Sequence, residues 1–226
     1  MQIKVLGITL TDLGLREALR QTDIFLKSGA LNTIAYVSMQ KLVLASENEE
    51  EKQWLEEMDM TICEDAEVLQ AAGITNRSRI RETEKNEYLI ELLRRIKHNN
   101  YTTFLFTDTE KNLVRLEEEL HSIMHGLPIK GHASLEEYGE NREGIWNAMN
   151  VVAPKVIISR FPYPEGMKLM HECRMLLNGE IWITLPEHIN AEKKKSVLSN
   201  LEQYFYKRRF TKKLIHFQEE NQEENR

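Results

Sequence analysis

Asp65 is the residue of this chain whose type and position best suit catalysis. It lies two residues after the short apolar run 61–63, beside Glu64, and opens a helical pattern. One interpretation is a helix N-cap, whose side-chain oxygen accepts hydrogen bonds from free backbone N–H groups. The other is a general base at the rim of a cleft, where partial burial raises the carboxyl pKa toward the working range. The sequence leaves both interpretations open.

A row of arginines follows this acid. Arg77, Arg79 and Arg81 alternate in the segment 74–82, which has the composition of a basic loop. Alternate residues of an extended loop point to the same side, and guanidinium groups bind phosphate oxygens through paired hydrogen bonds. The segment is therefore either a clamp for a diphosphate or a solvated loop whose arginines pair with nearby glutamates.

The short motifs that identify the commonest enzyme sites are absent. There is no GxGxxG or GxxxxGK[ST] phosphate loop, no GxSxG nucleophile elbow and no HExxH zinc motif. His121 and His125 are spaced i, i+4 on a predicted helix, but no third ligand is clearly placed. We therefore expect these histidines on a helix surface, and we expect neither a metal nor a cofactor.

Composition restricts the class of protein further. Across 226 residues, 30 Lys and Arg stand against 36 Asp and Glu, and the net charge of −6 argues against a nucleic-acid partner. Cys63 and Cys173 are too few for a disulfide scaffold or a four-cysteine zinc site. No apolar run approaches roughly 18 residues, and the first residues do not read as a signal peptide. These features predict a cytoplasmic protein.

Short β-branched runs alternate with longer helical patterns along the chain. The predicted strands are 3–8, 33–38, 61–63, 102–106, 127–131, 156–159 and 181–185. Residues 84–97 read as one long amphipathic helix. The alternation predicts an α/β fold with a mostly parallel, Rossmann-like sheet flanked by helices. Ligands of such sheets bind beyond the carboxyl ends of the strands, so the residues just after each strand are the candidates for a site.

Four stretches of sequence resemble blocks of the WecG/TagA/CpsF family of bacterial glycosyltransferases, over roughly residues 3–185. They are KVLGITLTDLGLREAL, VLASENEEEKQWLEEMDMTICEDAEVLQAAGI, TTFLFTDTEKNLVRLEEEL and APKVIISRFPYPEGMKLMHECRMLLNGEIWITL. The similarity lies in spacing and hydrophobic pattern. It implies an inverting, metal-independent transferase that moves an N-acetylmannosamine-type sugar from a UDP donor to an undecaprenyl-diphosphate-linked acceptor.

The same resemblance implies roles for individual residues. The aspartate of the family's Pro-Asp-Gly turn corresponds to Asp65, which makes Asp65 the proposed base. The family's Thr-Pro-Asn motif falls on 37–39 and its glycine turn on 107–108, where this chain keeps neither the Thr, the Asn nor the glycines. Together with the row of arginines, the residues expected to contact substrate are Ser38, Met39, Arg77, Arg79, Thr107, Asp108, Pro164 and Gly166.

The chain after residue 185 differs in composition from what precedes it. We predict an α/β glycosyltransferase-like domain at 1–185, a basic helical appendage at 186–218 and an acidic disordered tail at 219–226. The appendage interleaves lysines and arginines with aromatic residues, which is typical of a helix lying on an anionic membrane surface. A helix docked on its own domain or on a partner subunit is the alternative.

The basic appendage has one further implication for the site. Residues 193–217 would make the membrane contact, which would place the protein at the inner face of the cell membrane. The resembled family carries a C-terminal appendage that helps to close the active site. We therefore expect Arg208 or Arg209 to reach a substrate diphosphate.

Three functions fit these observations. The first is a divergent glycosyltransferase with a UDP-sugar donor and a lipid-linked acceptor, in cell-surface polysaccharide synthesis. The second is a catalytically inactive, family-derived scaffold that binds a further copy of itself or a partner glycosyltransferase, and the lost motif residues motivate it. The third is an unrelated parallel α/β domain that binds another nucleotide or small ligand. A sheet order unlike that of the family would favour the third.

Overall fold

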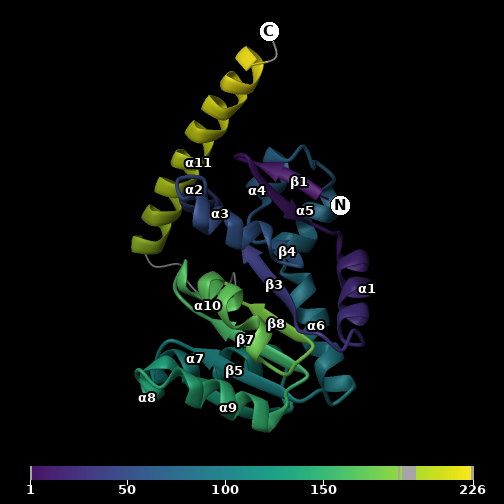
Figure 1. Cartoon of the computed structure of the whole chain (residues 1–226). Coiled ribbons are helices and arrows are strands. Elements are labelled where there is room, and N and C mark those ends of the chain that lie inside the picture. Colours follow the sequence, from purple (N-terminus) through teal and green to yellow (C-terminus); the bar gives the residue numbers. More distant parts are fainter. Residues whose placement is uncertain (1, 188, 190–196, 225–226) are drawn as a thin grey trace.

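A six-stranded parallel sheet forms the centre of the protein (Figure 1). The computed structural model describes residues 2–187, 189 and 197–224. In sheet order the strands are β4 (Met60–Cys63), β3 (Asn32–Val37), β8 (Ile181–Thr184), β7 (Val156–Arg160), β5 (Thr103–Thr107) and β6 (Ile129–Ser134). All except the edge strand β6 are almost wholly buried, which explains their continuous apolar sequences. The predicted α/β fold with a mostly parallel sheet is confirmed.

The strand order makes the chain change direction along the carboxyl edge of the sheet. From β3 the chain moves outward to β4 at one edge, whereas from β5 it moves to β6 at the opposite edge. Ligands of open parallel sheets bind outside the carboxyl ends of the strands, where the connections diverge in this way. The residues that follow β3, β4, β5, β7 and β8 therefore hold the positions of interest.

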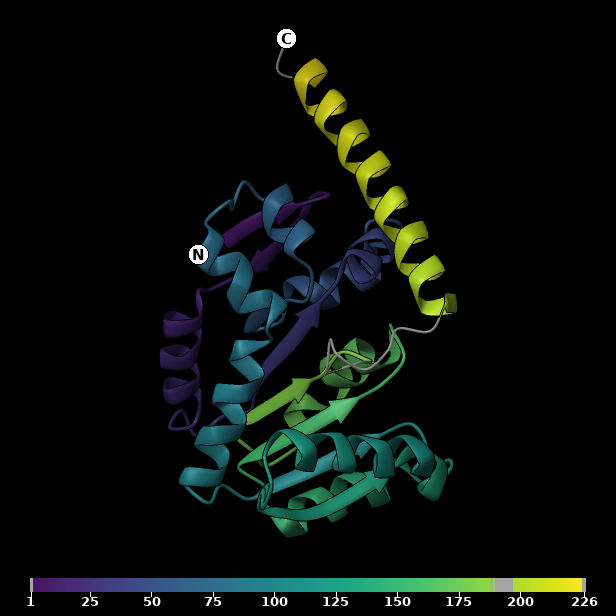
Figure 2. The same ribbon diagram turned by 180° about the vertical axis from the view of Figure 1, so that it is seen from behind.

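Two layers of helices cover the sheet (Figure 1; Figure 2). One face carries α1 (Leu15–Phe25), α6 (Glu87–His98) and α7 (Glu110–Ile123). The opposite face carries α2 (Met39–Ala45), α3 (Glu49–Glu56), α9 (Arg142–Val152) and α10 (Glu165–Cys173). Because successive strand residues point to opposite faces, Ile34 and Tyr36 of β3 pack in the first layer, while Ala35 and Val37 pack in the second.

The N-terminal residues form a separate β-hairpin, so the single strand predicted at 3–8 was wrong. β1 (Gln2–Val5) pairs antiparallel with β2 (Ile8–Thr11), outside the main sheet. Leu6 and Gly7 between them both have positive φ, 52° and 77°, as a two-residue type I′ turn requires. The turn was missed because Leu6 is apolar and continues the hydrophobic pattern of the strands beside it.

The segment expected to be an extended basic loop at 74–82 contains a helix, α5 (Arg77–Glu84). Asn76 begins it, because its side chain accepts hydrogen bonds from two first-turn N–H groups. Successive helix residues turn by about 100°, so alternate arginines do not share one side, and the basis for a three-arginine clamp was wrong. The long helix predicted at 84–97 is divided at Asn86, where φ is 49°.

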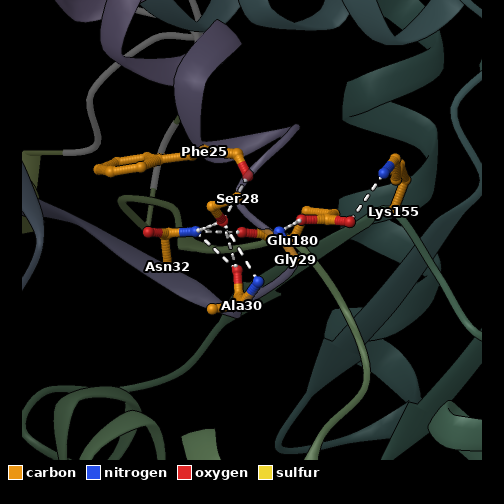
Figure 3. A network of polar contacts seen from close by, with 7 residues as sticks. All are labelled: Phe25, Ser28, Gly29, Ala30, Asn32, Lys155 and Glu180. Carbon is orange, nitrogen blue, oxygen red and sulfur yellow. Dashed lines mark hydrogen bonds and ion pairs between the residues drawn. The ribbon is translucent and has the colours of Figure 1, made fainter.

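A network of polar contacts fastens the amino end of the sheet, away from the carboxyl edge (Figure 3). Asn32, at the start of β3, donates through Nδ2 to Ser28 Oγ at 2.8 Å and to the carbonyl of Glu180 at 3.0 Å. The Glu180 carboxylate accepts from the Gly29 N–H at 3.0 Å and from Lys155 Nζ at 2.8 Å. The turn after α1 is thereby tied to the starts of β3 and β8.

The C-terminal helix α11 (Val197–Glu224) packs against α2, and its far end projects beyond the rest of the protein (Figure 1; Figure 2). Phe210 is buried in the core of the domain. Arg209 Nη2 contacts both carboxylate oxygens of Glu47, at 2.7 and 2.8 Å. The helix therefore docks on its own domain, which was one of the two predicted arrangements.

The boundaries of the C-terminal segments differ in part from the prediction. The last strand, β8, ends at Thr184, next to the predicted end of the α/β domain. The lysines at 193–195 lie outside the described residues. Helix α11 continues to Glu224, so it includes most of the segment 219–226 for which we predicted a disordered tail.

Candidate active site

Asp65 lies at the carboxyl end of β4, and its side chain reaches across to the end of β3. Its Oδ2 accepts a hydrogen bond from the Met39 N–H at 2.7 Å. Asp65 occupies the N-cap position of α4 (Ala66–Ala71), but its side chain makes no capping hydrogen bond. Burial raises the pKa of Asp65 to about 6, and the Met39 hydrogen bond opposes that rise. A carboxylate of this kind is ionised near neutral pH and still able to take a proton.

Two acid–lysine pairs flank this carboxylate. Lys41 Nζ, from α2, contacts Glu64 Oε1 at 2.6 Å and the Tyr36 carbonyl oxygen at 2.7 Å. Lys207 Nζ, from α11, contacts Glu67 Oε1 at 2.5 Å. Asp65 therefore lies near two pairs of opposite charge, whose lysines come from two different helices.

Neither lysine is among the site residues predicted from the sequence. The one local signal for Lys41 is its place in the first turn of the helix that follows β3. Lys207 lies 140 residues from its partner Glu67, and no spacing rule connects them. Arg208 is exposed and Arg209 is bound to Glu47. Glu67, and in smaller part Asp65, raises the pKa of Lys207.

Ser38 and Met39, both expected to contact substrate, have roles within the protein itself. The Ser38 side chain caps α2 by accepting from the Lys41 N–H at 3.3 Å. The Met39 side chain is buried, and its backbone N–H holds Asp65. Met39 therefore orients the Asp65 carboxylate, and Ser38 stabilises the start of α2.

Arg79, also expected to contact substrate, is held in a largely buried ion pair. Its Nη2 lies 2.7 Å from Asp12 Oδ1, and its Nη1 donates to Thr83 Oγ1 at 2.9 Å. The side chain of Asp12 is only 2% exposed, so it has no route to water and keeps its cation. Arg77, on the same helix, is exposed.

Thr107 and Asp108 lie at the far side of the carboxyl edge. Their strand, β5, is four inter-strand steps from β4, about 19 Å at the usual spacing. Thr107 Oγ1 donates to the Thr109 carbonyl at 2.9 Å, and Asp108 Oδ1 accepts from Asn112 Nδ2 at 2.7 Å. The structure does not bring them to Asp65, and their side chains stabilise the start of α7.

The start of α7 already carries a carboxylate from the chain itself. Oε2 of Glu136, in α8 (Leu135–Tyr138), accepts from the Glu110 N–H at 3.0 Å. The N–H groups at a helix N-terminus are where phosphates bind in many α/β proteins. Glu136 therefore occupies the place that a phosphate would take at this helix.

Pro164 and Gly166 lie at the start of α10. Pro164 is at the N-cap position. Gly166 is buried, and a Cβ atom there would come within 3.3 Å of Thr184 Oγ1 and 3.4 Å of Phe161 Cβ. This glycine allows α10 to pack closely on the end of β8, so its role in the structure is packing.

A buried ion pair that the sequence did not reveal stabilises the middle of the carboxyl edge. Arg160, the last residue of β7, donates through Nη2 to Glu119 Oε2 at 2.9 Å. Arg115 Nε donates to the other oxygen at 3.1 Å. Burial alone would raise the pKa of Glu119, but the charges and hydrogen bonds of Arg160 and Arg115 outweigh it and lower the pKa below its usual value.

The histidines at the end of α7 form no evident metal cluster. The ring centres of His121 and His125 are 6.3 Å apart, and His121 Nε2 lies 3.7 Å from Glu117 Oε1. Within the residues that the structure describes, no group of three metal-ligating side chains is found. Nor does any helix in that part of the chain have the length and apolar character to cross a membrane.

A parallel sheet between two helical layers, with a partly buried carboxylate at its carboxyl edge, defines an α/β protein of the Rossmann-like class. The chain belongs to the WecG/TagA/CpsF family of glycosyltransferases, because the model of that glycosyl transferase family matches residues 3–191. The match confirms the family resemblance. Among curated proteins, none matches the chain significantly.

Arg79→Ala is expected to destabilise the fold, because it leaves the Asp12 carboxylate buried without its cation. Removing one partner of a buried pair costs about 3–5 kcal/mol. Arg77→Ala is the matched control, since Arg77 is exposed on the same helix, and it should change the free energy of unfolding by less than about 0.5 kcal/mol. Urea denaturation measures both, and equal effects would contradict the structural role of Arg79.

The raised pKa of Asp65 makes stability depend on pH. The folded protein keeps the proton up to about pH 6, whereas the unfolded chain releases it near about pH 4. Stability supplied by the protonated form is therefore lost as the pH rises through 6. Asp65→Asn keeps an acceptor oxygen for Met39 and cannot ionise.

Between pH 4 and 7, the Asp65→Asn variant should gain stability over the unmodified protein, by up to about 3 kcal/mol. Urea unfolding at a series of pH values measures this gain. Glu118→Gln, an exposed change on α7, is the control variant. A stability difference for Asp65→Asn that does not change with pH would show that burial does not raise the pKa of Asp65.

Proposed function

We propose that this chain transfers an N-acetylmannosamine-type sugar, with inversion, from a UDP donor to an undecaprenyl-diphosphate-linked acceptor in cell-surface polysaccharide synthesis. Membership of the family supports the reaction class. The observation that carries the proposal is the partly buried Asp65 carboxylate at the carboxyl edge, with a pKa of about 6. It stands at the position that corresponds to the family's base.

In the proposed reaction, Asp65 takes the proton from the acceptor hydroxyl. The hydroxyl oxygen then attacks the anomeric carbon of the donor sugar from the face opposite UDP. The bond from that carbon to the diphosphate oxygen breaks, and UDP leaves with the electron pair. The Met39 N–H fixes one oxygen of Asp65, which leaves the other oxygen to receive the proton.

A second candidate function is a scaffold without catalysis in the same assembly. Glu136 supports it, because its carboxylate already accepts a hydrogen bond at the start of α7, the kind of helix N-terminus where phosphates bind in many α/β proteins. The internal hydrogen bonds of Asp108 support it as well. Such a protein would form no product from any nucleotide sugar and would form a stable complex with another glycosyltransferase.

Helix α11 supports a location at a membrane surface. Tyr204, Phe205 and Ile215 are exposed on it, and Arg208 and Lys212 are exposed beside them. At about 100° per residue these five side chains share the face opposite the buried Phe210. Aromatic and basic side chains on one face suit an anionic membrane surface, so we include peripheral binding at the inner face of the cell membrane in the proposal.

Asp65→Asn is expected to lower sugar transfer by about 100- to 10,000-fold, the usual contribution of a general base, and to leave UDP binding intact. Product formation with UDP-N-acetylmannosamine and a lipid-linked acceptor measures turnover, and calorimetry measures UDP binding. Asp23→Asn, an exposed change on α1, is the control. Unchanged turnover in Asp65→Asn would remove the assigned role, and absence of any product from the unmodified chain would favour the scaffold.

The full chain is expected to co-sediment with vesicles that contain anionic phospholipid, and to do so less at high salt. Phe205→Ser should weaken this binding by at least about tenfold, because it removes a large apolar side chain from the contact face. Val114→Ser, which changes an exposed apolar residue on α7, should have no effect. Failure of the full chain to bind anionic vesicles would rule out the membrane contact.

A further inference from the structure

We propose that Lys41 binds the diphosphate of the sugar donor, releasing Glu64 to do so. The inference rests on the proposed function and extends it to a residue for which the sequence predicted no role. This chain lacks the family's Thr and Asn at the end of β3, where it has Val37 and Met39. Lys41 lies four residues beyond Val37 and two beyond Met39, in the first turn of α2.

The geometry places the Lys41 ammonium beside the base. It contacts Glu64 Oε1 at 2.6 Å and the Tyr36 carbonyl oxygen at 2.7 Å. A lysine ammonium has three N–H donors, so two contacts leave a donor for a further acceptor. Its positive charge acts on Asp65, lowering the pKa of that carboxyl against the effect of burial. A group bound by Lys41 would therefore lie within reach of the residue that activates the acceptor.

Lys41 differs from the arginines at the same edge of the sheet in how deeply its acidic partner is buried. Arg79 is held by Asp12 and Arg160 by Glu119, and both carboxylate side chains are only 2% exposed. Neither acid is able to turn into water, so neither arginine is released at low cost. The Lys41 pair is different, because the Glu64 side chain is 19% exposed and has a path to solvent.

The exchange suits a diphosphate ester in particular. Negative charge builds on the diphosphate as the sugar leaves it, and a fixed cation nearby stabilises that charge. A lysine acts as a point charge that binds phosphate without a demanding geometry. Glu64 contacts the same ammonium group, so its carboxylate competes with the donor diphosphate for Lys41.

Calorimetric titration of the full chain with UDP, and separately with inorganic pyrophosphate, tests this competition. Lys41→Met should weaken the binding of both by at least about tenfold, a typical loss for one charge-assisted hydrogen bond, and Lys41→Arg should retain most of it. Glu64→Gln should strengthen both severalfold, because it removes the competing carboxylate. Lys85→Met, at an exposed lysine after α5, is the matched control and should bind as the unmodified chain does.

The opposite signs expected for Lys41→Met and Glu64→Gln exclude a purely structural pair, which would make both variants bind more weakly. Equal weakening of both, or unchanged binding in Lys41→Met, would overturn the proposal. If thermal unfolding shows that Lys41→Met is not folded, the binding of UDP and pyrophosphate by Glu64→Gln and Lys41→Arg tests the proposal instead. Binding of pyrophosphate but not of UDP would support diphosphate binding by Lys41 and contradict UDP as the nucleotide of the donor. If the unmodified chain bound neither UDP nor pyrophosphate, both the Lys41 contact and the UDP donor would be refuted. The role of Asp65 is tested separately, by turnover of the Asp65→Asn variant.

Discussion

A carboxylate held half-buried between the ends of two parallel strands is the constraint on which the site depends. Val37 of β3 pairs in register with Cys63 of β4, so Met39 and Asp65 both lie two residues beyond the last pair. The register therefore brings a backbone N–H to the carboxylate, and that hydrogen bond offsets part of the cost of burial. A one-residue shift of either strand would remove it.

The charged pairs along the carboxyl edge divide into two kinds by burial. Asp12 and Glu119 are sealed from water and hold their arginines as part of the fold. In the pairs made by Lys41 and Lys207, at least one side chain is more exposed than in the arginine pairs, and both pairs lie near Asp65. Their two lysines come from separate helices, α2 and α11.

Much of the fold could be predicted, because buried parallel strands are short apolar runs and the helices between them carry an apolar stripe. The errors occurred where local chemistry contradicted the wider pattern. Leu6 is apolar yet sits in a turn, and the polar composition of 74–82 hid a helix that begins at Asn76. Asp65 could be found because it lies just past the end of a buried strand, two residues after Cys63. Thr107, Asp108 and Gly166 were placed by correspondence to family motifs, and in the structure their contacts are internal.

The sequence by itself determined the α/β class, the family and the acid at the end of β4, since each depends on residues close together in the chain. Only the tertiary structure decided which cations surround that acid and which are committed elsewhere. Arg79 is 67 residues from Asp12, and Lys207 is 140 residues from Glu67. The packing of distant helices sets these partners, and it also sets the burial that raises the pKa of Asp65, so no local spacing encodes either.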